Sequence, residues 1–413
     1  MSWIRKYKST LILLAILGIH IFFRFYQLKE RASFGWDQID NAWAAYRILV
    51  DHNYPLQGMM AKLNSGITIG PLYYYYISIF YFFTNLHPIA SPIIAGASSI
   101  INFFVLYIII KKIFGKKTAY VALLINAVGF QSIIADRLQW PVNFIPTLGL
   151  LIFYFLYEVL NKKIRYIPLL AFAVGLSFHI HFTSIFYPII IFLTLPWWPK
   201  TKQACIYVVA SSFLFIAMVM PTILTFWTNK AGASNALSYG TSYYHGFHVR
   251  RFMQLSHDAF IQFQFILEFR FFRPLVFLIY PLFIFLYRVK TGVWNIRLMY
   301  LIFLWIFVPW IVFTVYSGEI TDYYFSMNRY VALGIISYIT VWFFEKNMTT
   351  KVIVCFFWVY YGFIGIRTFF LQMPTHDMQK KEDSVKNIIS AGQHIQFVEG
   401  SGESYMYSAF TKK

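Results

Sequence analysis

Residues 89–110 read IASPIIAGASSIINFFVLYIII and are followed at 111–117 by KKIFGKK. The first stretch has no charged residue and is long enough to cross the hydrocarbon core of a bilayer, which takes roughly 20 residues. A segment in that core must satisfy its own backbone hydrogen bonds, so it predicts a transmembrane helix. The lysines that follow predict a cytoplasmic end, because short cytoplasmic loops are rich in Lys and Arg.

Comparable apolar runs recur along the whole 413-residue chain. Hydrophobic residues make up 59% of it and charged residues only 12%, whereas soluble domains carry about 25% charged residues. We therefore predict an all-α integral membrane protein in which residues 1–370 form one polytopic domain and 371–413 a short non-cytoplasmic tail. About eleven transmembrane helices are expected, near residues 9–26, 89–110, 118–134, 144–160, 164–179, 182–198, 204–227, 274–288, 298–316, 328–344 and 350–370.

The charge distribution predicts the orientation. With a cytoplasmic N-terminus, residues 1–10 and five short loops hold 17 Lys or Arg and a single acidic residue, Glu345. These loops are 111–117, 161–165, 199–203, 288–297 and 345–351. Of the 16 acidic residues, 14 then lie on the outer side. The functional residues are therefore expected in the outer loops 27–88, 134–143, 228–273 and 317–328.

Net charge and cysteine content exclude two further classes. The charge of +19 is spread over short loops rather than gathered on one surface, so anionic lipid headgroups explain it better than nucleic acid does. The chain has two cysteines, Cys205 and Cys355, both inside apolar runs. Neither a disulfide framework nor a thiolate metal site is expected.

The tyrosine-rich segment 71–86 tests this topology. It is apolar enough to span the membrane, yet counting it as a span would place all five basic loops outside. We expect it to lie along the outer interface, where tyrosine rings are buried while their hydroxyls stay wet. The alternative is a true span with a second, compensating span elsewhere. A second interfacial helix is expected at 247–268, in the outer loop 228–273.

Residues 34–42, FGWDQIDNA, open a helix-like stretch just outside the first span. Asp37 and Asp40 lie three residues apart, so they share one helix face. A carboxylate near an apolar interface is costly unless it has a task or a partner. Asp37 is thus a candidate general base, and the alternative is that it only caps the helix. For Asp40 a structural role is an equal alternative.

The other outer loops supply further candidates. Residues 134–143 contain the adjacent pair Asp136 and Arg137, and Asp322 and Arg329 flank the outer end of a predicted span. His181 follows His179 in a turn between two spans, where hydrogen-bonded turn histidines are more plausible than a metal pair, because no HExxH or DxD motif is present. Arg137 is a candidate for holding a phosphate, or else an arginine that extends to the interface.

Arg250 and Arg251 lie among aromatic residues in the loop 228–273. A guanidinium group matches the geometry of phosphate oxygens and stays charged at an interface, so the pair is a candidate for gripping a lipid phosphate. The alternative is that both arginines belong to the polar face of an interfacial amphipathic helix.

The order of these motifs resembles the C-type (GT-C) membrane glycosyltransferases, in particular the group of protein O-mannosyltransferases and the lipid A aminoarabinose transferase. The resemblance spans roughly residues 5–345 and rests on WDQID at 36–40, GPLYYY at 70–75, the Asp136–Arg137 loop and His181. It implies that Asp37 is the catalytic carboxylate and Asp136 a second acidic residue. The chain departs from the group at Gly70, where the aminoarabinose transferases have proline, and it lacks the WWD-type motif of oligosaccharyltransferases.

The resemblance implies transfer of a sugar, with inversion, from a polyprenyl-phosphate-linked donor to an extracytoplasmic lipid, glycan or protein. No cofactor is expected, and a divalent metal has no support in the sequence. Besides Asp37 and Asp136, the residues expected to bind substrate are Asp40, Lys62, Tyr74, Arg137, His181, Arg250, Arg251, Asp322 and Arg329. The alternative function is that of a transporter or lipid flippase, for which polar residues through the bundle and matching repeats would be expected.

Overall fold

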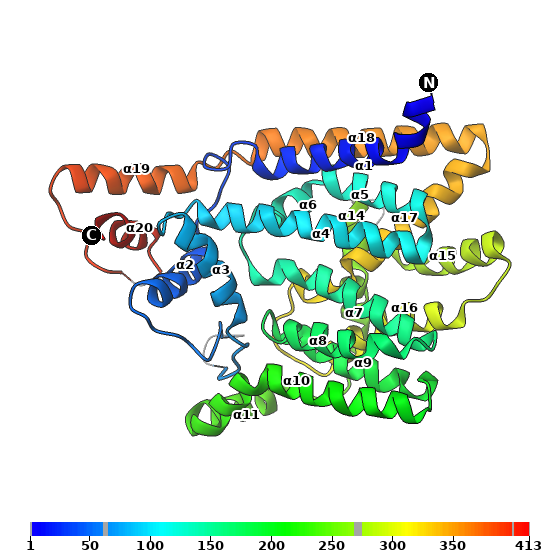
Figure 1. The fold of residues 1–413 in the computed structure, drawn as a ribbon, viewed down its shortest axis with the longest axis horizontal. Helices are drawn as coiled ribbons and strands as arrows, with labels where there is room; N and C mark the ends of the chain where they lie inside the picture. Colours follow the sequence, from blue (N-terminus) through cyan, green and yellow to red (C-terminus); the bar gives the residue numbers. More distant parts are fainter. Residues whose placement is uncertain (1, 61–64, 268–274, 399, 413) are drawn as a thin grey trace.

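The computed structural model describes residues 2–60, 65–267, 275–398 and 400–412. In these ranges the chain is helical with no strand beyond two isolated bridges, and its long helices run side by side in one bundle (Figure 1). The bundle helices are α1 (Ser2–Phe25), α4 (Ala90–Phe114), α5 (Lys116–Val128), α7 (Ile145–Leu160), α8 (Ile167–Ser177), α9 (Phe186–Thr194), α10 (Lys202–Thr228), α15 (Val276–Thr291), α16 (Ile296–Thr314), α17 (Arg329–Lys346) and α18 (Met348–Gln372).

Shorter helices connect and cap these long ones. The α-helices are α2 (Trp36–Leu49), α3 (Leu72–Phe83), α6 (Phe130–Ala135), α11 (Lys230–Tyr243), α12 (Val249–Gln254), α13 (Ser256–Ala259), α14 (Ile261–Leu267), α19 (Asp377–Ser390) and α20 (Gly402–Thr411). The 3₁₀ helices are η1 (Pro141–Phe144), η2 (Ile164–Tyr166), η3 (Phe182–Ile185), η4 (Leu195–Trp197) and η6 (Asp322–Asn328).

The predicted all-α membrane fold is confirmed, but the number of eleven spans is not. In the described ranges, seven helices are long and apolar enough to cross a membrane, and two further apolar helices, at 164–177 and 182–197, are shorter. The predicted span 118–134 is interrupted at Gly129, where α5 ends and α6 begins. The predicted span 274–288 corresponds to α15, whose 16 residues are shorter than a typical span.

The two ends of the bundle carry different elements, and their orientation in the membrane stays a prediction. Figure 1 places α2, α3, α11, α19 and α20 at the end opposite the N-terminus, and we call this the outer end. At the N-terminal end, Glu345 forms ion pairs with Lys117 and Lys290, which belong to two other predicted basic loops. The helix α3 has 12 residues, too few to cross a bilayer, and it packs against α2 at the outer end.

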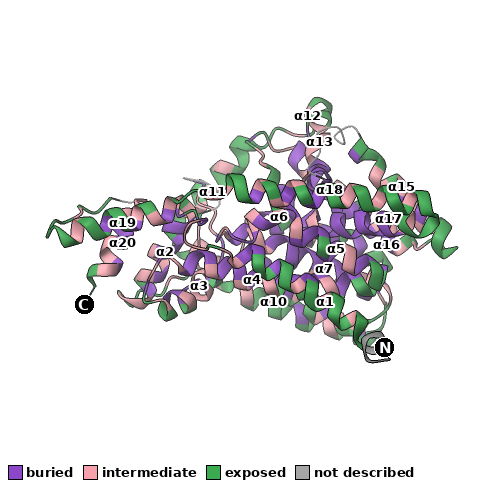
Figure 2. Cartoon of the chain, turned by 90° about the horizontal axis from the view of Figure 1, so that it is seen from above, coloured by how far each residue is buried: buried purple, intermediate pink, exposed green. Residues whose placement is uncertain are grey.

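The buried residues fall into two main clusters. The larger cluster fills the centre of the bundle and includes Trp305 and Phe153. Figure 2 shows this region as buried. The second lies at the outer end, where residues of α2 and α3 pack against Tyr405 and Met406 of α20. The carboxyl-terminal tail is therefore docked on the first outer loop.

The predicted single interfacial helix at 247–268 is wrong. Residues 249–267 form three short helices, α12 to α14, instead of one interfacial helix. The last of them packs against α17 and buries Gln262 and Phe263, because this stretch is apolar on too many sides to stay at a surface.

Candidate functional site

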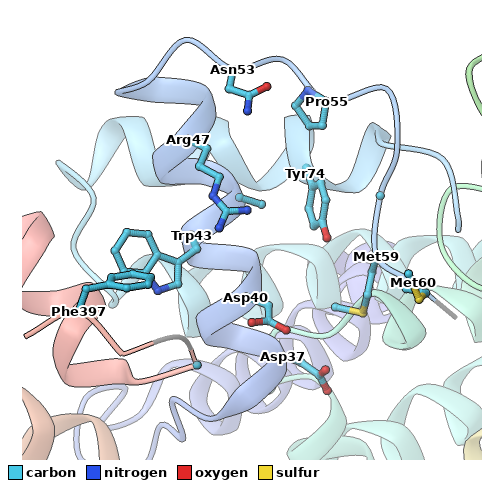
Figure 3. A pocket seen from close by; sticks show the side chains of 13 residues that line it. Asp37, Asp40, Trp43, Arg47, Asn53, Pro55, Met59, Met60, Tyr74 and Phe397 are labelled. Carbon is cyan, nitrogen blue, oxygen red and sulfur yellow. The ribbon is translucent and has the colours of Figure 1, made fainter. Parts of the chain in front are cut away.

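One face of α2 lines a cavity of about 450 Å³ at the outer end of the bundle. Asp37, Asp40, Ala44 and Arg47 all border it, and their spacing of three or four residues places them above one another on a helix. Figure 3 shows both carboxylates and the Arg47 guanidinium along this face. The cavity thus combines two acidic side chains with the basic side chain of Arg47.

The opposite wall comes from the rest of the first outer loop and from α3. Pro55, Met59 and Met60 line it together with Tyr74 (Figure 3). The loop folds back on itself, since Met60 and Thr68 form an antiparallel bridge.

Gly70 anchors this loop to the bundle. Its N–H donates to the carbonyl of Phe178 at 3.1 Å, in the turn after α8. A Cβ at position 70 would lie 1.9 Å from Nδ1 of His179, so only glycine allows this approach. The proline that the resemblance would place here has the same steric problem, and the departure from the family pattern at Gly70 thus has a structural reason.

Asp37 does not cap α2, which answers the alternative left open by the sequence. The N-cap is Gly35, whose N–H donates to Oε1 of Gln38 at 3.1 Å. Asp37 lies in the first turn and its side chain is half-buried at the cavity wall. Burial, and next the negative charge of Asp40, raise the pKa of Asp37 above its usual value. A carboxylate with a raised pKa is a better proton acceptor.

Tyr74 faces the same carboxylates from α3. Burial, and next the charge of Asp40, raise its pKa to about 12, so its hydroxyl stays protonated and can donate a hydrogen bond.

A second cavity, of about 560 Å³, lies beside the loop between α6 and η1. Asp322 and Arg329 line it with Trp140. Arg329 donates from Nη2 to Oγ of Ser132 at 3.0 Å. Burial, and next the charge of Asp258, raise the pKa of Asp322. Both predicted residues therefore border a cavity, but a different one from Asp37.

A hydrogen bond connects α2 to the loop that borders this second cavity. Gln38, next to Asp37, donates from Nε2 to the carbonyl of Gln139 at 3.0 Å. Gln139 immediately precedes Trp140 of the second cavity.

Asp136 is held in a buried ion pair. Arg24 of α1 donates to its Oδ2 from Nε at 3.0 Å and from Nη2 at 2.7 Å. The two side chains are 0% and 8% exposed. Asp136 borders neither outer cavity. Its catalytic role stays a prediction, and its geometry is that of a residue that positions α1 and α6.

Arg137 also turns toward α1. It donates from Nη1 to the carbonyls of Phe23 and Arg24 at 3.0 Å and from Nη2 to that of Gln27 at 3.2 Å. These are carbonyls at the C-terminal end of α1, which a cation is well suited to cap. Burial, and next the charge of Arg31, lower the pKa of Arg137 to about 10. Its proposed phosphate contact stays a prediction.

Three further candidates lie apart from the Asp37 cavity. His181 caps η3 by accepting from Thr183, its ring packs against Tyr323 and Tyr324, and burial lowers its pKa to about 3. Arg250 is exposed on α12, while Arg251 donates to the carbonyl of Gly318 at 3.1 Å. Lys62 lies outside the described residues.

The sequence analysis missed two kinds of residue in the cavity wall. Two of these residues, Trp43 and Arg47, lie on α2. Their spacing from Asp40, of three and seven residues, places them on the same helix face and could have predicted that they line the cavity. Phe397, which comes from the tail, had no such signal. Across the described ranges, no three His, Cys, Asp or Glu side chains are grouped so that they could hold a metal ion.

Comparisons with known proteins support the membrane fold. Residues 69–224 match the family "Dolichyl-phosphate-mannose-protein mannosyltransferase". A comparison with curated protein sequences finds no match. The fold is similar to that of ArnT from Cupriavidus metallidurans bound to undecaprenyl phosphate, with a TM-score of 0.62, 11% identity, and coverage of 95% of this chain and 84% of that one.

Two structures of an oligosaccharyltransferase from Archaeoglobus fulgidus are also similar. The apo form has a TM-score of 0.56 at 11% identity, and the match covers 99% of this chain and 64% of that one. The second structure, oligosaccharyltransferase AglB in complex with an inhibitory peptide and a dolichol-phosphate, has a TM-score of 0.51 at 12% identity. The match covers 98% of this chain and 60% of that one. At such low identities the similarity concerns the fold.

Proposed function

We propose that this chain, which has the GT-C fold, transfers a sugar from a polyprenyl-phosphate-linked donor to an acceptor outside the cytoplasm. It resembles the membrane glycosyltransferases of the protein O-mannosyltransferase group. The observation that carries the proposal is the cavity on α2, where Asp37 has a raised pKa and faces an open space that Arg47 also lines. The similar folds of ArnT and AglB, whose structures hold undecaprenyl phosphate and dolichol-phosphate, support a lipid-linked donor.

In the proposed reaction, Asp37 is the general base. Its carboxylate accepts the proton of an acceptor hydroxyl or amine as that atom attacks the anomeric carbon of the donor sugar. The bond between the anomeric carbon and the phosphate oxygen breaks, and both its electrons leave with the polyprenyl phosphate. The phosphate needs no prior protonation to leave, so one base suffices. Attack from the face opposite the leaving group inverts the anomeric configuration.

The developing charge on the phosphate requires a cation. Arg47 lines the same cavity as Asp37 and lies three helix turns along α2 from it. Its planar guanidinium can donate two parallel hydrogen bonds to phosphate oxygens. Arg329, in the cavity beside Trp140, is the second candidate for this contact. The mechanism uses no cofactor besides the lipid-linked donor.

The experiment is a comparison of glycolipids and surface glycans in cells that lack the protein and in the same cells carrying wild type, Asp37→Asn or Asp51→Asn. Asp51 belongs to the same outer loop and is exposed, but it does not line the cavity, so it is a matched control. We expect one glycan to be absent without the protein, absent with Asp37→Asn, and restored by the other two. Full restoration by Asp37→Asn would contradict the proposal.

A further inference from the structure

The carboxyl-terminal tail is fixed against the wall of the Asp37 cavity. The Tyr405 side chain of α20 is fully buried and its hydroxyl donates to the carbonyl of Leu86 at 2.8 Å. At the start of α19, Asp377 accepts from the N–H of Phe34 at 2.8 Å, and Lys381 donates to the carbonyl of the same residue. These contacts hold both tail helices beside α2 and α3.

The segment between the two tail helices contributes an aromatic side chain to the cavity. Phe397 lines it from the side of Trp43, with the two ring centroids 5.3 Å apart and the planes at 72° (Figure 3). Trp43 has a second aromatic contact, since its ring also packs edge-on against that of Tyr405, with the ring centroids 5.4 Å apart. Phe397, in contrast, is 61% exposed. Trp43 and Phe397 therefore give this cavity an aromatic side, and Asp37, Asp40 and Arg47 line the same cavity.

Three polar side chains of the wall are suited to binding hydroxyl groups. Asp40 can accept hydrogen bonds, Arg47 donates them, and Asn53 can do both. Carboxylates and a guanidinium on one side of a cavity, with aromatic rings on another, match a molecule that has a ring of hydroxyls around an apolar C–H face. A sugar ring has this shape.

We infer that Phe397 and Trp43 form an aromatic wall that binds a saccharide ring, so that the carboxyl-terminal tail is part of the substrate site. This inference rests on the proposed function and adds to it a specificity-determining residue from outside the membrane domain. The ring belongs either to the donor, as its transferred sugar, or to a glycan acceptor. Both sources present the same chemistry to the wall.

An acyl or prenyl chain fits this wall less well. Such a chain needs apolar surroundings on all sides, as in the groove between α8, α9 and α10 that is lined by Leu170, Phe192 and Phe215. Here Phe397 faces the same cavity as two carboxylates, and burying them against hydrocarbon would be costly.

A photo-reactive residue tests the inference directly. p-Benzoylphenylalanine is placed at position 397 in the full-length protein, and at position 398 as a matched control. Val398 is the neighbouring residue, is 56% exposed, and does not line the cavity. After irradiation of intact cells, the purified protein is analysed by mass spectrometry for attached saccharide. We expect a saccharide-bearing adduct from position 397 and none from position 398.

The adduct distinguishes the two sources. Mass added as sugar plus polyprenyl phosphate identifies the donor, and sugar without that lipid identifies a glycan acceptor. A lipid adduct without sugar, or equal labelling at both positions, would overturn the inference.

A kinetic comparison provides the second readout. Phe397→Ala should raise the KM of the substrate that carries the ring by about tenfold, while Val398→Ala leaves it unchanged and Phe397→Tyr restores it. Identical KM values for Phe397→Ala and Val398→Ala, with both proteins equally folded, would also overturn the inference. The cross-linking is repeated with Asp37→Asn, because saccharide binding does not require the base. Labelling at 397 in an Asp37→Asn protein that still transfers sugar would contradict the proposed base and leave the aromatic wall intact.

Discussion

Asp136→Asn should destabilise the protein more than it harms the chemistry. Arg24, which is fully buried, directs Nε and Nη2 to the same carboxylate oxygen, and it also donates to the carbonyls of Ala127 and Asn126 at 2.6 and 2.7 Å. The asparagine keeps the shape of the side chain and its acceptor oxygen. It removes the negative charge, however, and leaves a buried guanidinium without a counter-charge.

The magnitude follows from the burial of the pair. Removing one partner of a buried ion pair costs about 3–5 kcal/mol, because the remaining charge is not compensated. Replacing both partners with apolar residues of similar size is often nearly neutral. We therefore expect Asp136→Asn to lose about 3–5 kcal/mol of unfolding free energy, and the double variant Arg24→Met/Asp136→Leu to lose much less than the single one.

The assay is reversible unfolding in mixed micelles with an increasing fraction of SDS, and transfer activity is measured on the fraction that stays folded. Asp136→Asn should retain much of its activity per folded molecule, since Asp136 borders neither outer cavity. An Asp136→Asn protein as stable as wild type but inactive would refute this reasoning. It would restore the catalytic role that the family resemblance implies for Asp136.

Three further outcomes are expected. The rate of transfer should fall as the pH drops through the raised pKa of Asp37. Asp40→Asn should shift this fall in rate to lower pH, because it removes a negative charge that raises the pKa of Asp37. A pH profile of kcat/KM measures both effects. Gly70→Ala should cost about 1–3 kcal/mol of unfolding free energy, since its Cβ meets the ring of His179, and His179→Ala in the same protein should recover part of it. Glu382→Gln should make the tail about fivefold more accessible to limited proteolysis, because this buried carboxylate connects α19 to Lys29 of the first outer loop at 3.0 Å, and a cleavage rate equal to wild type would contradict it.

The sequence was most informative where its signals are local. Apolar runs located the bundle helices, and the lysines that follow residue 110 predicted an end of the bundle that also holds Glu345 and the N-terminus. Helix interruptions were harder to predict. The apolar run at 118–134 continues through Gly129, but α5 ends there. A Cβ on Gly129 would meet the hydroxyl of Tyr361 on α18, so this break is a point where two helices approach closely. That contact depends on packing between distant segments.

The site divides in the same way. Asp37, Asp40 and Tyr74 were predicted and share one cavity, and Arg47 could have been added from its position on the same helix face. The pairing of Asp136 with Arg24 joins residues 112 apart in the chain, and no local pattern predicts it. Phe397 reaches the cavity only because α19 and α20 dock on α2 and α3, which lie far earlier in the sequence.

The role of Asp37 as the base is the central claim, and single-turnover transfer by purified protein in nanodiscs tests it most directly. Lipid extract from cells that lack the protein supplies donor and acceptor, and wild type, Asp37→Asn and Asp51→Asn are compared. The account predicts that Asp37→Asn binds the donor like wild type but transfers sugar about 10²–10⁴-fold more slowly, while Asp51→Asn is unchanged. Transfer by folded Asp37→Asn at a rate near that of wild type would contradict it.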